Sequence, residues 1–161
     1  DAHLDAVRPG LALYGIAPCP AVSDVRPVLS WKTRILSLRH MSAGESVGYN
    51  RTYIASSPRV IAVLPVGYAD GYNRAFSNKA QVRIRGRLVP VVGQISMDLT
   101  TVDVTEVPGV SQGDEVTLLE ADPESPISAA ALAQSLGTIP YEVLTSIGNR
   151  ARRFYYKPAF K

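Results

Sequence analysis

Three short turns carry the residues whose types and spacing could do chemistry. They lie at residues 47–53, 65–72 and 92–98, and each places a glycine beside an aromatic or polar residue after a β-branched apolar run. At such a point a rigid strand gives way to a loop that can present a side chain. In the first turn Tyr49 follows Gly48, so its phenol could project into a cleft and exchange a proton with a substrate.

Residue type alone leaves a second interpretation open for each candidate. A phenol has a pKa of about 10 and is a poor base at neutral pH unless cations or hydrogen bonds lower that value. Arg51 is a candidate for such a neighbour of Tyr49, but a tyrosine also often packs its ring and uses its hydroxyl structurally. In the same way, Met97 could be a core methionine, and Arg8 could be a surface cation.

The segments around the turns are predicted to be short antiparallel strands. Alternation over residues 28–39 indicates a half-exposed strand, and the apolar run over residues 59–66 indicates a buried one. Residues 80–92 predict a hairpin with a tight Arg-Gly-Arg connection, and residues 95–104 and 115–119 predict two more strands. The spacing of these short strands and turns favours a closed or nearly closed antiparallel barrel.

Two short helices are predicted to interrupt the strands. Ser128 can cap a helix over residues 129–136, and Gly137 stands where that helix should stop. A second helical turn over residues 140–146 begins with a proline, which is favoured at the first helical position.

The two ends of the chain are predicted to be extended. Residues 11–16 are apolar and follow a Pro-Gly break, which favours a turn leading into a strand. The proline-rich residues 17–27 have the composition of a linker. Residues 152–156 are predicted to form a closing edge strand whose arginines discourage pairing with other chains.

Composition narrows the class of protein. The 161 residues, 46% of them hydrophobic, are enough for one well-buried core, and the net charge of +3 gives no strong case for a nucleic-acid or membrane partner. A single cysteine excludes an internal disulfide, and two histidines leave little for a zinc site, so no metal is predicted. No segment has the length of a membrane span or the pattern of a secretory signal, so we expect a cytoplasmic protein. The start at Asp1 is expected to mark a fragment of a longer protein.

Together the three turns resemble the carboxy-terminal domain of alanine racemase, a pyridoxal-phosphate enzyme of the fold III class. The resemblance runs from residues 7–15 to residues 150–153. It implies that residues 1–16 end an N-terminal α/β (TIM) barrel, that residues 17–27 link the domains, and that residues 28–161 form a mainly β domain, an antiparallel β-barrel with one or two short helices. It also implies a homodimer with shared active sites that interconverts L- and D-alanine for peptidoglycan synthesis.

The resemblance implies a role for four residues at the substrate. Tyr49 matches the base that exchanges the α-proton on one face of the substrate, and it would reach the cofactor of the other subunit. The backbone N–H of Met97 would help to bind the substrate carboxylate. Tyr68 and Arg74 match residues that line the entrance, although both could equally hold their turn.

Four further residues would bind pyridoxal phosphate. By resemblance, Arg8 faces the pyridine nitrogen, and the backbone amides of Gly10 and Leu11 help to hold the phosphate. Because arginine stays protonated, it discourages protonation of the ring, which favours racemisation over side reactions. Asn149 stands where the family commonly has a tyrosine that touches the phosphate, and it could form a hydrogen bond there instead.

The chain departs from the family in two further ways. Gln94 stands where an arginine is common, which predicts a less cationic entrance. The lysine that binds the cofactor covalently belongs to the amino-terminal barrel, and none of the four lysines here has a matching context: Lys32, Lys79, Lys157 and Lys161. We therefore expect the chain by itself to be inactive.

Three alternatives stay open at this point. The enzyme could racemise serine or a broader range of amino acids, or the chain could be a non-catalytic dimerisation or binding module. A barrel that binds single-stranded nucleic acid would need aromatic residues among its basic ones, which the row Arg83, Arg85 and Arg87 lacks.

Overall fold

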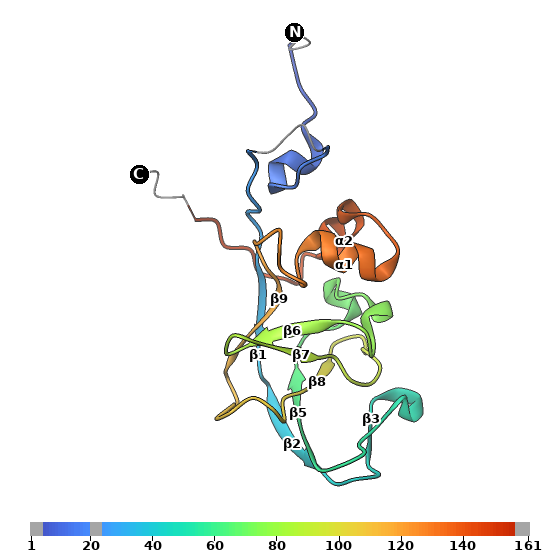
Figure 1. Ribbon diagram of the computed structural model, residues 1–161. Coiled ribbons are helices and arrows are strands. Elements are labelled where there is room, and N and C mark those ends of the chain that lie inside the picture. Colours follow the sequence, from blue (N-terminus) through green and yellow to red (C-terminus); the bar gives the residue numbers. More distant parts are fainter. Residues whose placement is uncertain (1–4, 20–23, 157–161) are drawn as a thin grey trace.

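The computed structural model describes residues 5–19 and 24–156 as a mainly β protein with two α-helices, and it confirms that part of the predicted fold (Figure 1). The helices and strands, in chain order, are η1 (Gly10–Tyr14), β1 (Trp31–Arg34), β2 (Ser37–Met41), β3 (Ser46–Val47), η2 (Tyr49–Arg51), β4 (Tyr53–Ile54), β5 (Arg59–Leu64), η3 (Tyr68–Asp70), η4 (Arg74–Phe76), β6 (Gln81–Ile84), β7 (Arg87–Pro90), β8 (Thr100–Asp103), β9 (Glu115–Leu119), α1 (Ala129–Leu136) and α2 (Pro140–Ser146).

The strands form two sheets and a small hairpin, and every pairing is antiparallel. One sheet has the order β1-β9-β6-β7, the other has the order β2-β5-β8, and β3 pairs with β4. Buried residues alternate with exposed or half-buried ones along β6 and β8, so one face of each sheet covers the core.

The two sheets meet along two seams and surround the larger of two hydrophobic clusters, and a smaller cluster contains Met41, Ala55, Ile61 and Val92. At the first seam the N–H of Ile35 donates to the carbonyl of Asp114 beside β9, whereas the next N–H, of Leu36, donates to β5 in the other sheet. The one strand predicted over residues 28–39 is therefore wrong, because the chain changes sheets in the middle. At the second seam, Val91 after β7 bridges to β8.

An aromatic cluster connects the core to the second turn. Tyr72, which is only 1% exposed, lies edge-on to Trp31 at 5.9 Å and 5.0 Å from Phe76 between ring centroids. Burial raises the pKa of the Tyr72 phenol above its ordinary value. Tyr72 lies between η3 and η4, and Phe76 is the last residue of η4. These two buried rings therefore anchor the second turn to the core.

Elements with strong local signals form as predicted. The hairpin is β6 and β7, and its turn residues Arg85 and Gly86 both have left-handed backbone, with φ of 48° and 78°. Helix α1 has the predicted bounds; the hydroxyl oxygen of Ser128 accepts from the N–H of Ala131 at 3.2 Å, and Gly137 follows with φ 69°.

Helix α2 also has its predicted bounds and packs against α1 (Figure 1). Strands β5 and β9 confirm the strands predicted over residues 59–66 and 115–119. Within residues 5–19 and 24–156, no helix reaches the length and apolar character that a membrane crossing requires.

Two predicted strands near the termini are wrong. The apolar residues 11–16 lie mostly in η1, because Gly10 and Gly15 adopt left-handed backbone and the turn between them buries Leu11 in the core. A short apolar run fits a strand or a helical turn equally well, so its pattern could not decide.

The closing edge strand predicted over residues 152–156 does not form. The guanidinium of Arg153 donates to the carbonyl of Ile147 at 2.9 Å, and that of Arg152 lies 4.9 Å from the ring centroid of Phe154. The tail therefore contacts itself and the end of α2, and it adds no strand to either sheet.

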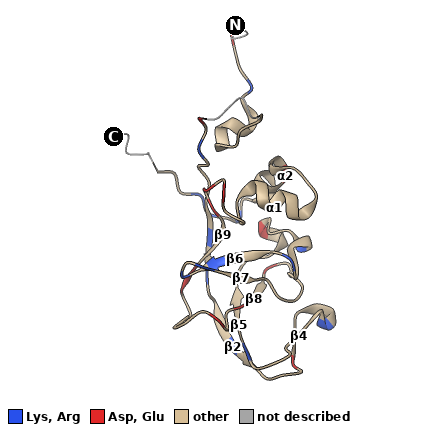
Figure 2. Ribbon diagram, viewed as in Figure 1, with Lys and Arg blue, Asp and Glu red and all other residues tan. Residues whose placement is uncertain are grey.

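Ion pairs surround the β6–β7 hairpin, whose arginines are blue in Figure 2. Arg83 pairs with Glu120 at 2.5 Å, and Arg85 pairs with Asp114 at 2.8 Å. The hydrogen bond from Arg83 lowers the pKa of the Glu120 carboxyl, and a hydrogen bond from Ser125 lowers it further. The guanidinium groups of Arg83 and Arg85 are therefore paired with carboxylates within the protein.

Candidate active site

The first turn lies at the tip of the β3–β4 hairpin and bends sharply. Gly48, Asn50 and Arg51 all have left-handed backbone, with φ of 78°, 60° and 51°. This conformation is uncommon for residues other than glycine, so three such residues around one tyrosine reverse the chain within a few residues. As a result, Tyr49 projects outward with 68% of its surface exposed.

The first and third turns touch through glycine backbone. A Cβ on Gly48 would lie 2.8 Å from the amide nitrogen of Gln94, and a Cβ on Gly93 would lie 2.8 Å from the carbonyl oxygen of Val47. Any side chain would push the two turns apart. Glycine at both positions lets Tyr49 stand directly beside the third turn.

The second and third turns are joined by main-chain hydrogen bonds. The N–H of Tyr68 donates to the carbonyl of Ser96 at 3.1 Å, and the N–H of Ala69 donates to the carbonyl of Met97 at 3.0 Å. A Cβ on Gly67 would lie 2.4 Å from that Met97 oxygen. Tyr68 and Met97 themselves remain 48% and 53% exposed.

These bonds explain why the strand predicted over residues 95–104 is shorter than expected. Only β8 is extended, because the N–H of Ser96 donates to the carbonyl of Leu99, and the N–H of Leu99 donates to the Ser96 hydroxyl at 3.0 Å. This small loop presents Met97 beside the second turn.

Arg150 brings the segment that contains Asn149 to the same turns. Its guanidinium lies 3.3 Å from a carboxylate oxygen of Asp70 in the second turn and donates to Asp98 at the end of the third turn at 2.6 Å. The hydrogen bond with Asp98, followed by the charge of Asp70, raises the pKa of Arg150 above its ordinary value. The N–H of Gly148 also donates to the Asp70 carbonyl at 3.0 Å.

The side chain of Arg74 is directed at the third turn. It lies in η4, which is capped by Asn73, whose side-chain oxygen accepts from the N–H of Ala75 at 2.9 Å. The guanidinium of Arg74 donates to the side-chain oxygen of Gln94. With a neutral glutamine as partner, the guanidinium charge of Arg74 is not opposed by an acid in this contact.

The stem of the Tyr49 hairpin is held by a polar cluster. The Tyr53 hydroxyl donates to Asp103 on β8 at 3.1 Å, and the same carboxylate oxygen lies 3.7 Å from the guanidinium of Arg59. Burial, followed by the negative charge of Asp103, raises the pKa of the Tyr53 phenol above its ordinary value. The hairpin is therefore anchored to both β5 and β8.

The predicted cofactor residues Arg8, Gly10 and Leu11 belong to the N-terminal arm, residues 5–19, and lie apart from the three turns. Gly10 and Leu11 open η1, where a Cβ on Gly10 would lie 2.8 Å from the hydroxyl of Tyr141 on α2, and Arg8 is exposed. Within residues 5–19 and 24–156, no hydrogen bond or ion pair links Arg8, Gly10 or Leu11 to the three turns. The structure thus brings the predicted substrate residues and the loop of Asn149 together, but not the arm.

The sequence profile of the family described as "Alanine racemase, C-terminal domain" matches residues 28–155. The chain belongs to the alanine racemase family. It is 46% identical over 162 residues to an alanine racemase of Sorangium cellulosum and 48% identical over 155 residues to one of Thermodesulfovibrio yellowstonii. These matches cover 98% and 96% of this chain but 43% and 42% of the relatives, so the chain spans less than half of their length.

Solved alanine racemase structures share the fold. The crystal structure of the enzyme from Bartonella henselae "with covalently bound pyridoxal phosphate" is 36% identical with a TM-score of 0.81, over 91% of this chain and 40% of that one. The enzyme from the D-cycloserine producer Streptomyces lavendulae is 32% identical with a TM-score of 0.82, over 92% of this chain and 40% of that one.

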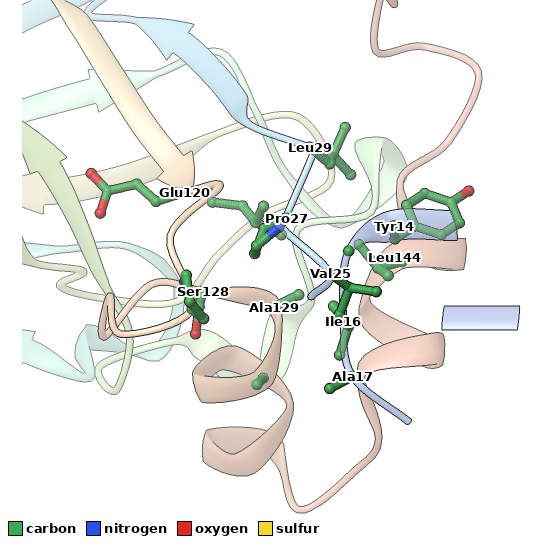
Figure 3. Close-up of a pocket in the computed structure, with 14 residues that line it drawn as sticks. Tyr14, Ile16, Ala17, Val25, Pro27, Leu29, Glu120, Ser128, Ala129 and Leu144 are labelled. Atoms are coloured by element: carbon green, nitrogen blue, oxygen red, sulfur yellow. The ribbon is translucent and has the colours of Figure 1, made fainter. Parts of the chain in front are cut away.

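A pocket of this racemase domain lies apart from the three turns (Figure 3). It has a volume of about 330 Å³ and lies between the N-terminal arm, the end of β9 and the two helices, where Ile16, Pro27, Ala129 and Leu144 line it. None of the predicted site residues lines this pocket. The side chains of Tyr49, Tyr68 and Met97 on the three turns are exposed.

Sequence reasoning missed three residues that hold the three turns in place: Tyr53, Asn78 and Arg150. Asn78 carried a signal, because asparagine tolerates the left-handed backbone that it adopts here, with φ 55°. Tyr53 and Arg150 carried none, since their partners are distant in sequence.

Proposed function

We propose that the full-length protein is a pyridoxal-phosphate-dependent alanine racemase that interconverts L- and D-alanine, with Tyr49 as one of two bases. The observation that carries the proposal is the exposed Tyr49 phenol, held beside the turns of Tyr68 and Met97 by glycine contacts and main-chain hydrogen bonds. A base that acts on a substrate bound by another surface must project in this way. The relatives named alanine racemase support the same activity.

The donor groups of this chain fit part of the cofactor. Arg8 offers a permanently charged guanidinium, which suits a ring nitrogen, and Gly10 and Leu11 open a helical turn, where N–H groups have no partner within the helix and suit a phosphate. When bound, pyridoxal phosphate stabilises the charge that remains after the α-proton leaves. Of the two described lysines, Lys32 lies on β1 and pairs with Glu115 at 2.6 Å.

Each turn residue would act on the substrate in its own way. Tyr49 would hold or accept the α-proton at its hydroxyl oxygen, and a second base outside this chain would serve the opposite face, which inverts the carbon. The N–H of Met97, which donates to no acceptor within residues 5–19 and 24–156, would donate to the substrate carboxylate. Tyr68 and Arg74 would limit which side chains enter, and Asn149 would contact the phosphate.

The exposed turn face supports an assembly in which another protein surface covers it. Tyr49, Tyr68, Met97 and Leu99 expose between 41% and 68% of their surface on adjoining turns. Exposed apolar groups that cluster in this way commonly mark a protein interface. We propose that this face meets the N-terminal barrel of the other subunit in a cytoplasmic homodimer that supplies D-alanine for peptidoglycan.

The test is to incubate the full-length protein with pyridoxal phosphate and L-alanine and to separate the enantiomers by chiral chromatography. The mixture should approach equal amounts of L- and D-alanine. Serine and larger amino acids, assayed in parallel, measure the substrate range that the Arg74–Gln94 entrance allows. If no amino acid in the panel is racemised, the proposed activity is wrong.

The 161-residue chain itself should not bind the cofactor covalently. Its absorbance spectrum with pyridoxal phosphate should lack the visible band of a lysine-bound cofactor, and the appearance of that band would contradict the expectation that the anchoring lysine lies outside this chain.

A further inference from the structure

Asn78 lies between the first and third turns and binds both. Its side-chain oxygen accepts from the N–H of Gly93 at 2.6 Å, and its side-chain nitrogen donates to the hydroxyl oxygen of Thr52 at 3.1 Å. The orientation of this amide follows from chemistry. A backbone N–H can only donate, so the oxygen must face Gly93 and the NH₂ group must face Thr52.

The preceding residue binds the third turn as well. The hydroxyl oxygen of Ser77 accepts from the N–H of Ile95 at 3.0 Å, and the hydroxyl donates to the carbonyl of Arg74 at 2.5 Å. Through these bonds, Ser77 and Asn78 connect the end of η4 to Ile95 and Gly93 of the third turn. The left-handed backbone of Asn78 is disfavoured for most side chains and persists where its surroundings hold it.

The first turn is consequently fixed at both ends. On the entering side, Gly48 packs against Gln94, and on the leaving side, Thr52 binds Asn78. Tyr49 itself forms no side-chain hydrogen bond with any residue in the described part of the chain, so the backbone around it decides where its hydroxyl lies.

We propose that Asn78 is a positioning residue of the racemase reaction, which fixes Tyr49 relative to Met97 by holding the first turn against the third. This inference rests on the proposed function. A base that is displaced by about 1 Å can lose on the order of a hundredfold in rate, so a small loosening of the turn should be visible in kcat.

The test compares three variants of the full-length protein. Asn78→Gly removes both hydrogen bonds, and because glycine adopts left-handed backbone freely, it adds no strain. Asn78→Asp keeps the acceptor for Gly93 and offers a second oxygen that can accept from the Thr52 hydroxyl. Ser125→Ala is the matched control, since this buried serine also forms two hydrogen bonds, with Ile127 and Glu120, in the loop between β9 and α1.

Two measurements separate the inference from the proposed function. Hydrogen exchange of the peptide over residues 46–54 reports the order of the turn whether or not alanine is the substrate, and kcat and KM for alanine report its use. Asn78→Gly should speed exchange of that peptide and lower kcat about tenfold or more, with a smaller change in KM. Asn78→Asp should restore most of both, and Ser125→Ala should lower only Tm.

Three outcomes would overturn the role of Asn78. They are unchanged exchange of the peptide in Asn78→Gly, faster exchange with wild-type kcat, and equal losses of kcat in Asn78→Gly and Ser125→Ala. If the wild-type protein does not racemise alanine but Asn78→Gly still loosens the peptide, the contact between the turns stands and the proposed function fails.

Discussion

The β6–β7 hairpin and the turn face differ in which groups hold their shape. At the hairpin, side chains bind side chains: Arg83 forms two hydrogen bonds to Glu120, and Arg85 forms two to Asp114. The charged groups of these residues are therefore already engaged in ion pairs within the protein. A substrate that reached the hairpin would have to compete with pairs that are already formed.

On the turn face, main-chain hydrogen bonds, close glycine contacts and supporting side chains such as Asn78 and Arg150 hold the loops, and the predicted substrate residues stay exposed. The bonds from Tyr68 to Ser96 and from Ala69 to Met97 join main chain to main chain, while Tyr49 remains 68% exposed. The difference teaches that a region can be rigid without consuming the groups that chemistry needs. This arrangement is what a preorganised site requires.

The largest effect is expected from removing the Tyr49 hydroxyl. In the full-length protein, Tyr49→Phe should lower kcat for alanine racemisation by roughly a thousandfold, because a positioned acid or base contributes about 10²–10⁴ in rate. Tm should hardly change, since the side chain is exposed. Tyr155→Phe is the control, because this tyrosine is 90% exposed on the tail. Wild-type kinetics in Tyr49→Phe would remove the distinction between the turn face and an ordinary surface.

A smaller effect is expected when one glycine of each region, Gly48 or Gly86, is replaced with alanine. Gly48 and Gly86 both have φ 78°, but a Cβ on Gly48 would lie 2.8 Å from the Gln94 nitrogen, whereas a Cβ on Gly86 would meet nothing within 4 Å. Gly86→Ala should cost about 1 kcal/mol of unfolding free energy from backbone strain alone. Gly48→Ala should cost about 1–2 kcal/mol more, because crowding adds to the strain and the ψ of 176° places Gly48 in a region essentially restricted to glycine.

Urea denaturation measures both glycine variants. Equal losses would mean that the close approach of the first and third turns is unimportant to the fold. A loss of kcat in Gly48→Ala alone would link that approach to the proposed reaction.

The smallest effect is a pH dependence at the hairpin. Arg83 lowers the folded-state pKa of Glu120 below its ordinary 4.5, so the pair stabilises the fold above that value, and the contribution disappears as pH falls through the lowered pKa. In Glu120→Gln, unfolding free energy at neutral pH should fall by about 1 kcal/mol or less, and the acid-side decline should flatten. An unchanged acid-side decline in urea titrations would contradict the prediction. The main-chain hydrogen bonds of the turn face contain no titratable group, so they should not contribute to this pH dependence.

Sequence predicted best where the signal is local. The Ser128 cap and Gly137 stop gave α1 its bounds, and the Arg-Gly turn gave the β6–β7 hairpin, because a few adjacent residues determine each of these structures. The same local logic located the turns that carry Tyr49 and Met97. Their catalytic roles came from the family resemblance and stay predictions.

Prediction from the sequence failed where contacts between distant segments determine the structure. Nothing near Ile35 indicates that its N–H and that of Leu36 bond to different sheets, and nothing near residues 152–156 indicates that they pair with no strand. The contacts of Asn78 and Arg150 are of the same kind, since they link loops that are separated by 15 to 80 residues. Such contacts exist only once the two sheets have assembled.

The edge-on contact between Trp31 and Tyr72 gives this domain a built-in optical probe. Trp31 is the only tryptophan of the chain, and its partner ring stands between the core and the segment that leads to Arg74. A shift of that segment will change the surroundings of the indole and therefore its emission. Movements beneath the second turn can thus be followed by intrinsic fluorescence, without attaching a dye.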